Sequence, residues 1–143
     1  MLPAPDLQRF LDAQHGSYAT ALTEIRAGHK RSHWMWYVFP QLRGLGSSET
    51  SRFYGIQDRA EAEAYLAHPM LGPRLLEICQ ALLKLESRDA TRILGSPDDL
   101  KLKSSMTLFA ALHNANPIFQ QVLDEFFDGT QDSKSLQLLR QTE

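Results

Sequence analysis

The sequence has little of several features that mark particular classes of protein. It has one cysteine, Cys79, so no disulfide can form within the chain, and we expect a reducing compartment. No apolar run approaches the roughly 18 residues that a membrane-spanning helix needs. The first six residues lack the basic region and the apolar stretch of a signal peptide. We therefore expect a cytoplasmic protein without a membrane segment.

An excess of charge of one sign is also missing. The formal net charge is −2, which argues against general nucleic-acid binding, because such binding needs an excess of basic residues. The charges are nevertheless unevenly spread. Residues 25–48 contain four basic residues, two histidines and no acid, whereas residues 119–143 contain five acids and two basic residues. Two differently solvated surfaces would explain this pattern, and so would a local anion site on a mildly acidic body.

Recognisable metal-binding and nucleotide-binding patterns are missing as well. His29 and His33 have the spacing of two ligands on one helical face, but basic residues surround them and no further ligand pattern accompanies them. Residues 44–49 lack the third glycine of a dinucleotide-binding loop and the Gly-Lys-Ser/Thr ending of a phosphate loop. We predict no metal and no cofactor. The sequence leaves open whether the protein catalyses any reaction.

Helical periodicity dominates what is present. Residues 70–86 form the clearest amphipathic pattern, in which the lone thiol lies on the apolar face. Residues 96–99, Ser-Pro-Asp-Asp, are typical of a helix start, and that helix should run to about His113. Asp6, Ser17, Asp58 and Asp132 are further candidate caps. The 143 residues show no repeat and no linker. We predict one all-α, multihelical domain over residues 1–143, with about eight or nine helices and an ordered core at about 6–139.

The densest aromatic cluster lies between His33 and Phe39. We expect about two helical turns that end at Pro40, because proline removes an amide donor and restricts the residue before it. The composition would also suit a strand, but no other segment is a candidate to pair with it. The cluster is either the centre of a core or the wall of a site for a planar ligand. Trp34 and Trp36 face different sides of a helix, so one of them should be structural.

A second cluster begins about sixty residues later, where Lys101, Ser104 and Ser105 share one face near a helix start. Helix N-termini favour anions, although a solvated lysine pair would explain this pattern equally well. If the two clusters meet across one cleft, they form a candidate ligand site. Its residues would be His33, Trp36, Tyr37, Gln41, Arg43, Lys101, Ser104 and Ser105. His33 would be the general acid or base if a reaction takes place.

Three blocks of the sequence resemble a known family. They are residues 33–46 (HWMWYVFPQLRGLG), 67–75 (AHPMLGPRL) and 96–109 (SPDDLKLKSSMTLF). Together they are similar to a bacterial family of uncharacterised small all-helical proteins, a domain of unknown function whose members are often labelled calpastatin automatically. The resemblance covers about residues 6–139. It implies a multihelical domain whose helices pack somewhat as in armadillo-type folds, and it implies no activity and no catalytic residue.

Two functional hypotheses follow from these observations. The first is a compact cytoplasmic module that binds a small ligand or a protein partner without catalysis, because no nucleophile, base or metal constellation is recognisable. The second is an enzyme or sensor that acts on a phosphorylated or nucleotide-like small molecule. It would use the aromatic segment at residues 33–43 for the ring and the helix start at residues 101–105 for the anion. It requires the two segments to meet around one accessible hollow.

Overall fold

A computed structural model describes residues 6–142, and this part of the chain contains ten helices and no strand. The helices are α1 (Gln8–Gln14), α2 (Tyr18–Arg26), α3 (Met35–Val38), α4 (Glu49–Tyr54), α5 (Arg59–Ala67), α6 (Leu71–Leu83), α7 (Ala90–Leu94), α8 (Asp98–Ala110), α9 (Ile118–Phe127) and α10 (Ser133–Gln141). The all-α prediction is confirmed, with slightly more helices than the predicted eight or nine. Residues 1–5, on which the expectation of no signal peptide largely depends, lie outside the described residues.

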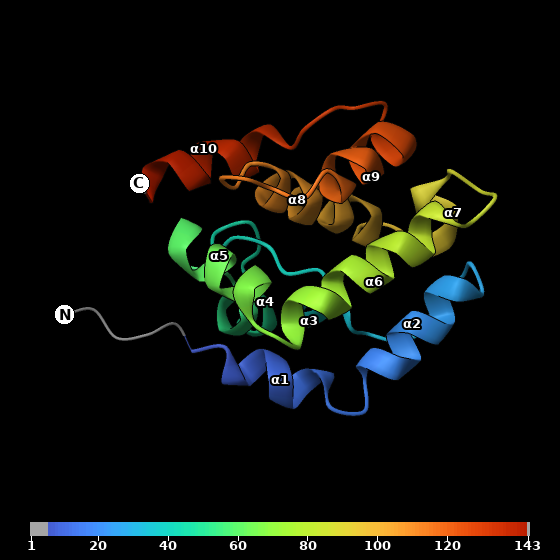
Figure 1. The fold of residues 1–143 in the computed structure, drawn as a ribbon, viewed down its shortest axis with the longest axis horizontal. Helices are drawn as coiled ribbons and strands as arrows, with labels where there is room; N and C mark the ends of the chain where they lie inside the picture. Colours follow the sequence, from blue (N-terminus) through green and yellow to red (C-terminus); the bar gives the residue numbers. More distant parts are fainter. Residues whose placement is uncertain (1–5, 143) are drawn as a thin grey trace.

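Helix α6 lies in the middle of the fold and packs against α2, α5 and α9 (Figure 1). Helices α8, α9 and α10 lie on one side of α6, and α1 and α2 lie on the other (Figure 1). Helix α8 packs against α7, α9 and α10, and it also contacts the short helix α3. The contact between α3 and α8 brings together two segments that are about sixty residues apart in the chain. Within residues 6–142, every helix is too short or too polar to cross a lipid bilayer.

A row of aromatic rings crosses the core and ties four helices together. Phe10 of α1 meets Tyr65 of α5 edge-on, with ring centroids 5.1 Å apart. Tyr65 lies 5.8 Å from Phe109 of α8, which lies 5.5 Å from Phe119 of α9. All four rings are fully buried. Cys79 is also fully buried, and burial raises the pKa of its thiol, so it acts as a small core residue as the sequence predicts.

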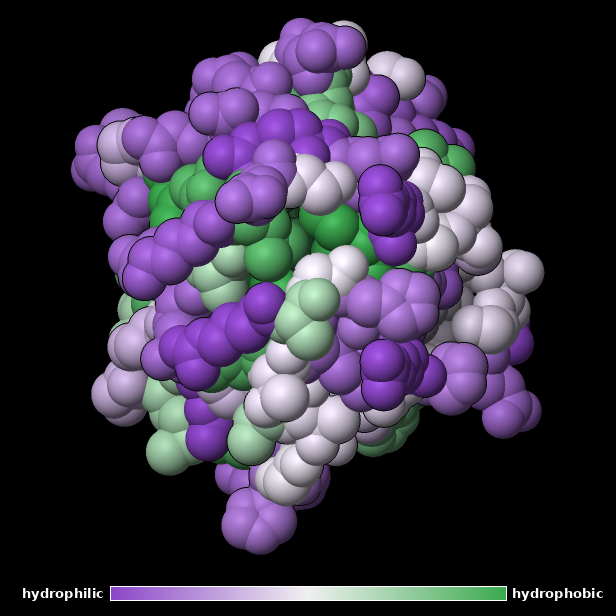
Figure 2. Space-filling view, turned by 90° about the vertical axis from the view of Figure 1, so that its right-hand side faces the viewer, coloured by the Kyte–Doolittle hydropathy of each residue, from purple (hydrophilic) through white to green (hydrophobic). Residues whose placement is uncertain are grey.

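The face of the molecule formed by α7 and the neighbouring ends of α2 and α6 is mainly polar. Figure 2 shows that face, with apolar residues visible in a shallow hollow and hydrophilic residues around it. Only three large apolar side chains are strongly exposed among the described residues, namely Phe53, Met70 and Leu100. Isolated exposed side chains of this kind are ordinary on a soluble domain's surface.

Several predicted helix starts are confirmed and others are wrong. The carboxylates of Asp58 and Asp132 cap α5 and α10, and each accepts a hydrogen bond from an amide three residues ahead at 2.9 Å. Ser17 makes no such bond. Ser96 does not cap α8 either, because Pro97 occupies the cap position and the first helical residue is Asp98. Helix α8 also ends at Ala110 and not near His113.

The aromatic segment forms one helical turn, at Met35–Val38, and not the two that its composition and Pro40 predict. The cause lies before the turn, where the amides of Arg31 and Ser32 bind the buried carboxylate of Glu24. These residues are therefore held in a loop. After the turn, Pro40 ends the helix as expected. The loop before α3 and α3 itself place residues 33–37 beside the start of α8.

Candidate functional site

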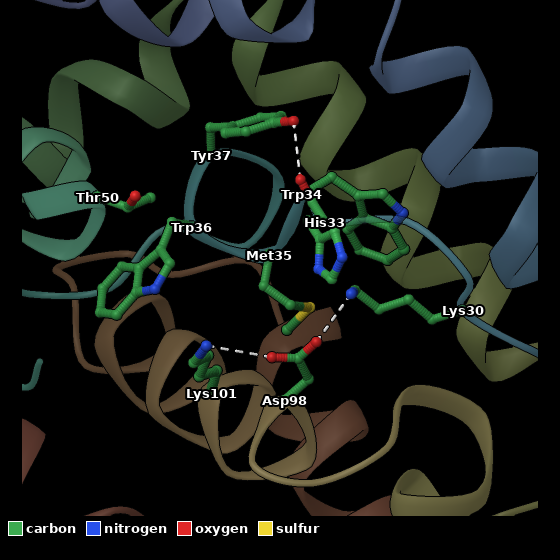
Figure 3. A pocket seen from close by; sticks show the side chains of 9 residues that line it. All are labelled: Lys30, His33, Trp34, Met35, Trp36, Tyr37, Thr50, Asp98 and Lys101. Atoms are coloured by element: carbon green, nitrogen blue, oxygen red, sulfur yellow. Dashed lines mark hydrogen bonds and ion pairs between the residues drawn. The ribbon is translucent and has the colours of Figure 1, made fainter. Parts of the chain in front are cut away.

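A pocket of about 210 Å³ lies between the aromatic segment and the start of α8 (Figure 3). Its lining comes from the loop before α3, from α3 itself, from the start of α4 and from the first turn of α8. The lining residues are Lys30, His33, Trp34, Met35, Trp36, Tyr37, Thr50, Asp98 and Lys101. Part of each sequence cluster therefore lines one hollow, namely His33, Trp36 and Tyr37 of the first and Lys101 of the second.

The carboxylate of Glu24, on α2, holds the loop that contains Lys30 and His33 through hydrogen bonds. One carboxylate oxygen accepts hydrogen bonds from the Arg31 amide at 2.8 Å, the Ser32 amide at 3.0 Å and Trp34 Nε1 at 2.9 Å. The other oxygen accepts one from Ser32 Oγ at 2.5 Å. Burial opposes ionisation of this carboxyl, but the four hydrogen bonds together outweigh burial and lower the pKa of Glu24 to about 2. The pocket loop is therefore fixed by a charged acceptor behind it.

Asp98 joins the two walls of the pocket. Its Oδ2 lies 2.8 Å from Lys30 Nζ, and its Oδ1 lies 3.2 Å from Lys101 Nζ (Figure 3). The backbone amide of Lys30 also donates to the Ile93 carbonyl at 2.8 Å, which ties the loop to α7. The Lys30 side chain is only 7% exposed, whereas that of Lys101 is 28% exposed. Lys101 is therefore the cation that a ligand in the pocket can reach.

The two tryptophans have different roles. Trp34 is fully buried and bound to Glu24, so it is the structural one of the pair. Trp36 is half-buried and lines the pocket, with Lys101 Nζ 5.6 Å from its ring centroid. The loop after α3 also approaches this ring. A Cβ added at Gly46 would lie 3.0 Å from Trp36 Cζ2, so the backbone there passes directly against the indole.

Tyr37 and His33 also line the pocket. Tyr37 is half-buried, its hydroxyl donates to the His33 carbonyl at 3.1 Å, and its ring lies 5.2 Å from that of Tyr54. The Tyr37 carbonyl accepts from the buried Gln14 side chain at 2.7 Å. The His33 imidazole is exposed at the edge of the pocket. An exposed imidazole beside a cavity can bind a ligand oxygen or exchange a proton with it.

Four residues of the predicted site lie elsewhere. Gln41 is buried, and its backbone carbonyl accepts a hydrogen bond from the Ile56 amide at 2.8 Å. Arg43 has an exposed side chain that is not part of the pocket lining. Ser104 and Ser105 turn into the fold, because α8 is buried along most of its length after the first turn. Ser104 Oγ donates to the Leu100 carbonyl at 3.1 Å, and the Ser105 side chain is fully buried.

The predicted site did not include five of the lining residues, namely Lys30, Trp34, Met35, Thr50 and Asp98, and it missed Glu24 as the residue behind the loop. Asp98 looked like a helix-start acid that complements the dipole, although its main partners are two lysines. A single acid among the apolar residues at 18–25 was the available signal for Glu24. No cluster of His, Cys, Asp or Glu that could hold a metal ion occurs in the described part of the chain.

Comparison with known proteins gives the family. A family model described as "Protein of unknown function (DUF1810)" matches residues 4–139. The chain belongs to this family. The DUF1810 chain is also similar to a solved structure, that of the conserved hypothetical protein Rv1873 from Mycobacterium tuberculosis. The two are 50% identical with a TM-score of 0.92, and the match covers 94% of this chain and 96% of that chain. No match was found among curated proteins. The resemblance to an uncharacterised all-helical family is thus confirmed.

Proposed function

We propose that this DUF1810 protein binds a small molecule that carries a planar ring and an anionic group, and that it does so in the pocket between α3 and α8. The observation that carries this proposal is the meeting of the half-buried Trp36 and Tyr37 with the accessible ammonium of Lys101 around one hollow. Aromatic walls with a few convergent polar groups are typical of small-molecule sites.

The size and charge of the pocket narrow the ligand. A volume of about 210 Å³ is below the roughly 300–1,000 Å³ of pockets that enclose a drug-sized molecule, so the hollow suits a small ligand with one ring system and one anionic group. Lys30 and Lys101 contribute two positive charges, and Asp98 contributes one negative charge. The pocket therefore has an excess of one positive charge before His33 is counted, which suits one anionic group.

A thermal-shift panel of nucleosides, nucleoside monophosphates, sugar phosphates and ADP-ribose-type compounds tests this proposal. A ligand at 100 times its dissociation constant adds about 2.7 kcal/mol of stability, which raises the melting temperature by several degrees. We expect stabilisation by compounds with both a ring and an anion. Lys101→Met keeps the length of the side chain but removes its charge, and it should abolish most of the shift.

Lys103→Met is the matched control, because Lys103 lies on the same helix and is not part of the pocket lining. The control should respond to ligands as the wild type does. Equal shifts in the wild type and in both variants would place binding outside this pocket and contradict the proposal. Absence of any shift across the panel would favour a protein partner.

The exposed His33 at the edge of the pocket is the observation that favours a second function, an enzyme acting on the same kind of ligand. Histidine is the usual side chain for proton transfer near neutral pH. Incubation of each stabilising compound with the protein, followed by mass spectrometry, separates the two functions. A binding module leaves the compound unchanged, whereas an enzyme converts it and loses that conversion in His33→Ala.

A further inference from the structure

The pocket contains a hydrogen-bond donor that the fold itself does not use, namely the indole N–H of Trp36. Trp34 donates its indole N–H to Glu24, but among residues 6–142 the Trp36 nitrogen makes no hydrogen bond. In Figure 3 that nitrogen lies on the edge of the ring turned toward Lys101. The ring centroid of Trp36 and Lys101 Nζ are 5.6 Å apart, so the two donors belong to the same corner of the pocket.

One face of the Trp36 ring is already covered by the Lys101 ammonium. The chain at Gly46 passes so close to the indole that a Cβ there would be 3.0 Å from Cζ2. A flat ligand that stacked on the face of Trp36 beside Lys101 would have to displace the ammonium. A ligand oxygen that binds at the N–H edge beside Lys101 would leave the ammonium in place.

Both groups are donors, and the indole N–H cannot accept a hydrogen bond. An oxyanion is the ligand group that satisfies such a pair, because hydrogen bonds to a charged acceptor are about twice as strong as neutral ones. The acceptor nearby, Asp98, is already held by Lys30 and Lys101. The corner is therefore suited to a phosphate or carboxylate and not to a cation.

We infer that Trp36 recognises the anionic group of the ligand through its indole N–H, together with Lys101, and does not serve as the platform on which the ring stacks. This inference rests on the proposed function, and it says where in the pocket the anionic group and the ring of the ligand bind. The ring of the ligand then lies toward Met35, Tyr37 and His33, which line the rest of the hollow.

The chain has two tryptophans, so ¹⁵N-labelled tryptophan gives two indole N–H signals in an NMR spectrum, and Trp36→Phe assigns them. Phenyl phosphate (ring and anion), phenol (ring alone) and inorganic phosphate (anion alone) are the probes. We expect saturable downfield movement of the Trp36 signal with the two phosphates and none with phenol. The Trp34 signal is the internal control and should stay in place, because its N–H is buried and bound to Glu24.

Trp36→Phe keeps an aromatic ring and removes the donor. It should weaken binding of phenyl phosphate about tenfold or more, the loss expected for a hydrogen bond to a charged group. An unchanged affinity in this variant would overturn the inference, and so would an unmoved Trp36 signal in a protein that phenyl phosphate stabilises. Those results leave the proposed function standing.

The proposed function fails in a different way. If inorganic phosphate moves the Trp36 signal and binds as tightly as phenyl phosphate does, the anion corner is supported and the ring requirement is wrong. If none of the three probes moves the signal or stabilises the protein, both proposals are contradicted.

Discussion

Removal of the Glu24 carboxylate should destabilise the protein strongly, because four donors depend on it. In Glu24→Ala the fully buried N–H of Trp34 loses its acceptor, which costs about 1–3 kcal/mol. The amides of Arg31 and Ser32 lose bonds to a charged group, and because Arg31 is exposed and Ser32 half-buried we expect water to replace those bonds in part. We expect a total loss of about 3–5 kcal/mol in the free energy of unfolding. Glu24→Gln keeps one acceptor oxygen and should lose about 1–2 kcal/mol.

Urea denaturation measures these losses as shifts of the midpoint at constant slope. Glu63→Ala is a suitable control, since Glu63 is an exposed acid within α5, and its loss should stay below about 0.5 kcal/mol. A loss under about 1 kcal/mol for Glu24→Ala would refute the reasoning, because it would mean that the buried indole N–H finds another acceptor. Equal losses for the alanine and glutamine variants would show that charge, and not the number of hydrogen bonds, determines the contribution of this residue.

Three further predictions concern the stability of the protein. Because the pKa of Glu24 is lowered to about 2, its contribution is complete above its ordinary value of 4.5 and is lost as pH falls toward 2. The stability gap between wild type and Glu24→Gln should therefore narrow across that range, and a gap that is constant with pH would be the contrary result. Gly46→Ala places a Cβ 2.8 Å from Ser51 Cβ and 3.0 Å from Trp36 Cζ2. We therefore expect a loss of about 1–3 kcal/mol in the free energy of unfolding and a changed tryptophan emission, whereas unchanged values would contradict these close approaches. Arg9→Met leaves the buried Glu61 without its ion partner at 2.9 Å, so unfolding measurements should show a loss of about 3 kcal/mol, and a loss under about 1 kcal/mol would contradict this.

The fold could be predicted from the sequence because most of its determinants are local. The apolar face of α6, the capping carboxylates Asp58 and Asp132 and the stop at Pro40 all act within a few residues of their position in the chain. The length of α3 could not be predicted in this way. It depends on Glu24, which lies on another helix and removes the amides of Arg31 and Ser32 from helical bonding.

The site could be predicted in part, for a similar reason. Aromatic density and helix-start chemistry pointed to His33, Trp36, Tyr37 and Lys101, and these four residues line one pocket. Side-chain direction further along α8 depends on what packs around that helix, so the burial of Ser104 and Ser105 was not visible in the local pattern. The role of Lys30 could not be predicted either, because its partner Asp98 lies on α8, far along the chain.

A crystal structure of the protein with the most strongly stabilising ring-bearing anion would test the central claim most directly. The account predicts electron density for the ligand in the hollow between α3 and α8, with an anionic oxygen within hydrogen-bond distance of Lys101 Nζ. Density for the ligand at any other place on the molecule, with this hollow filled only by water, would contradict it.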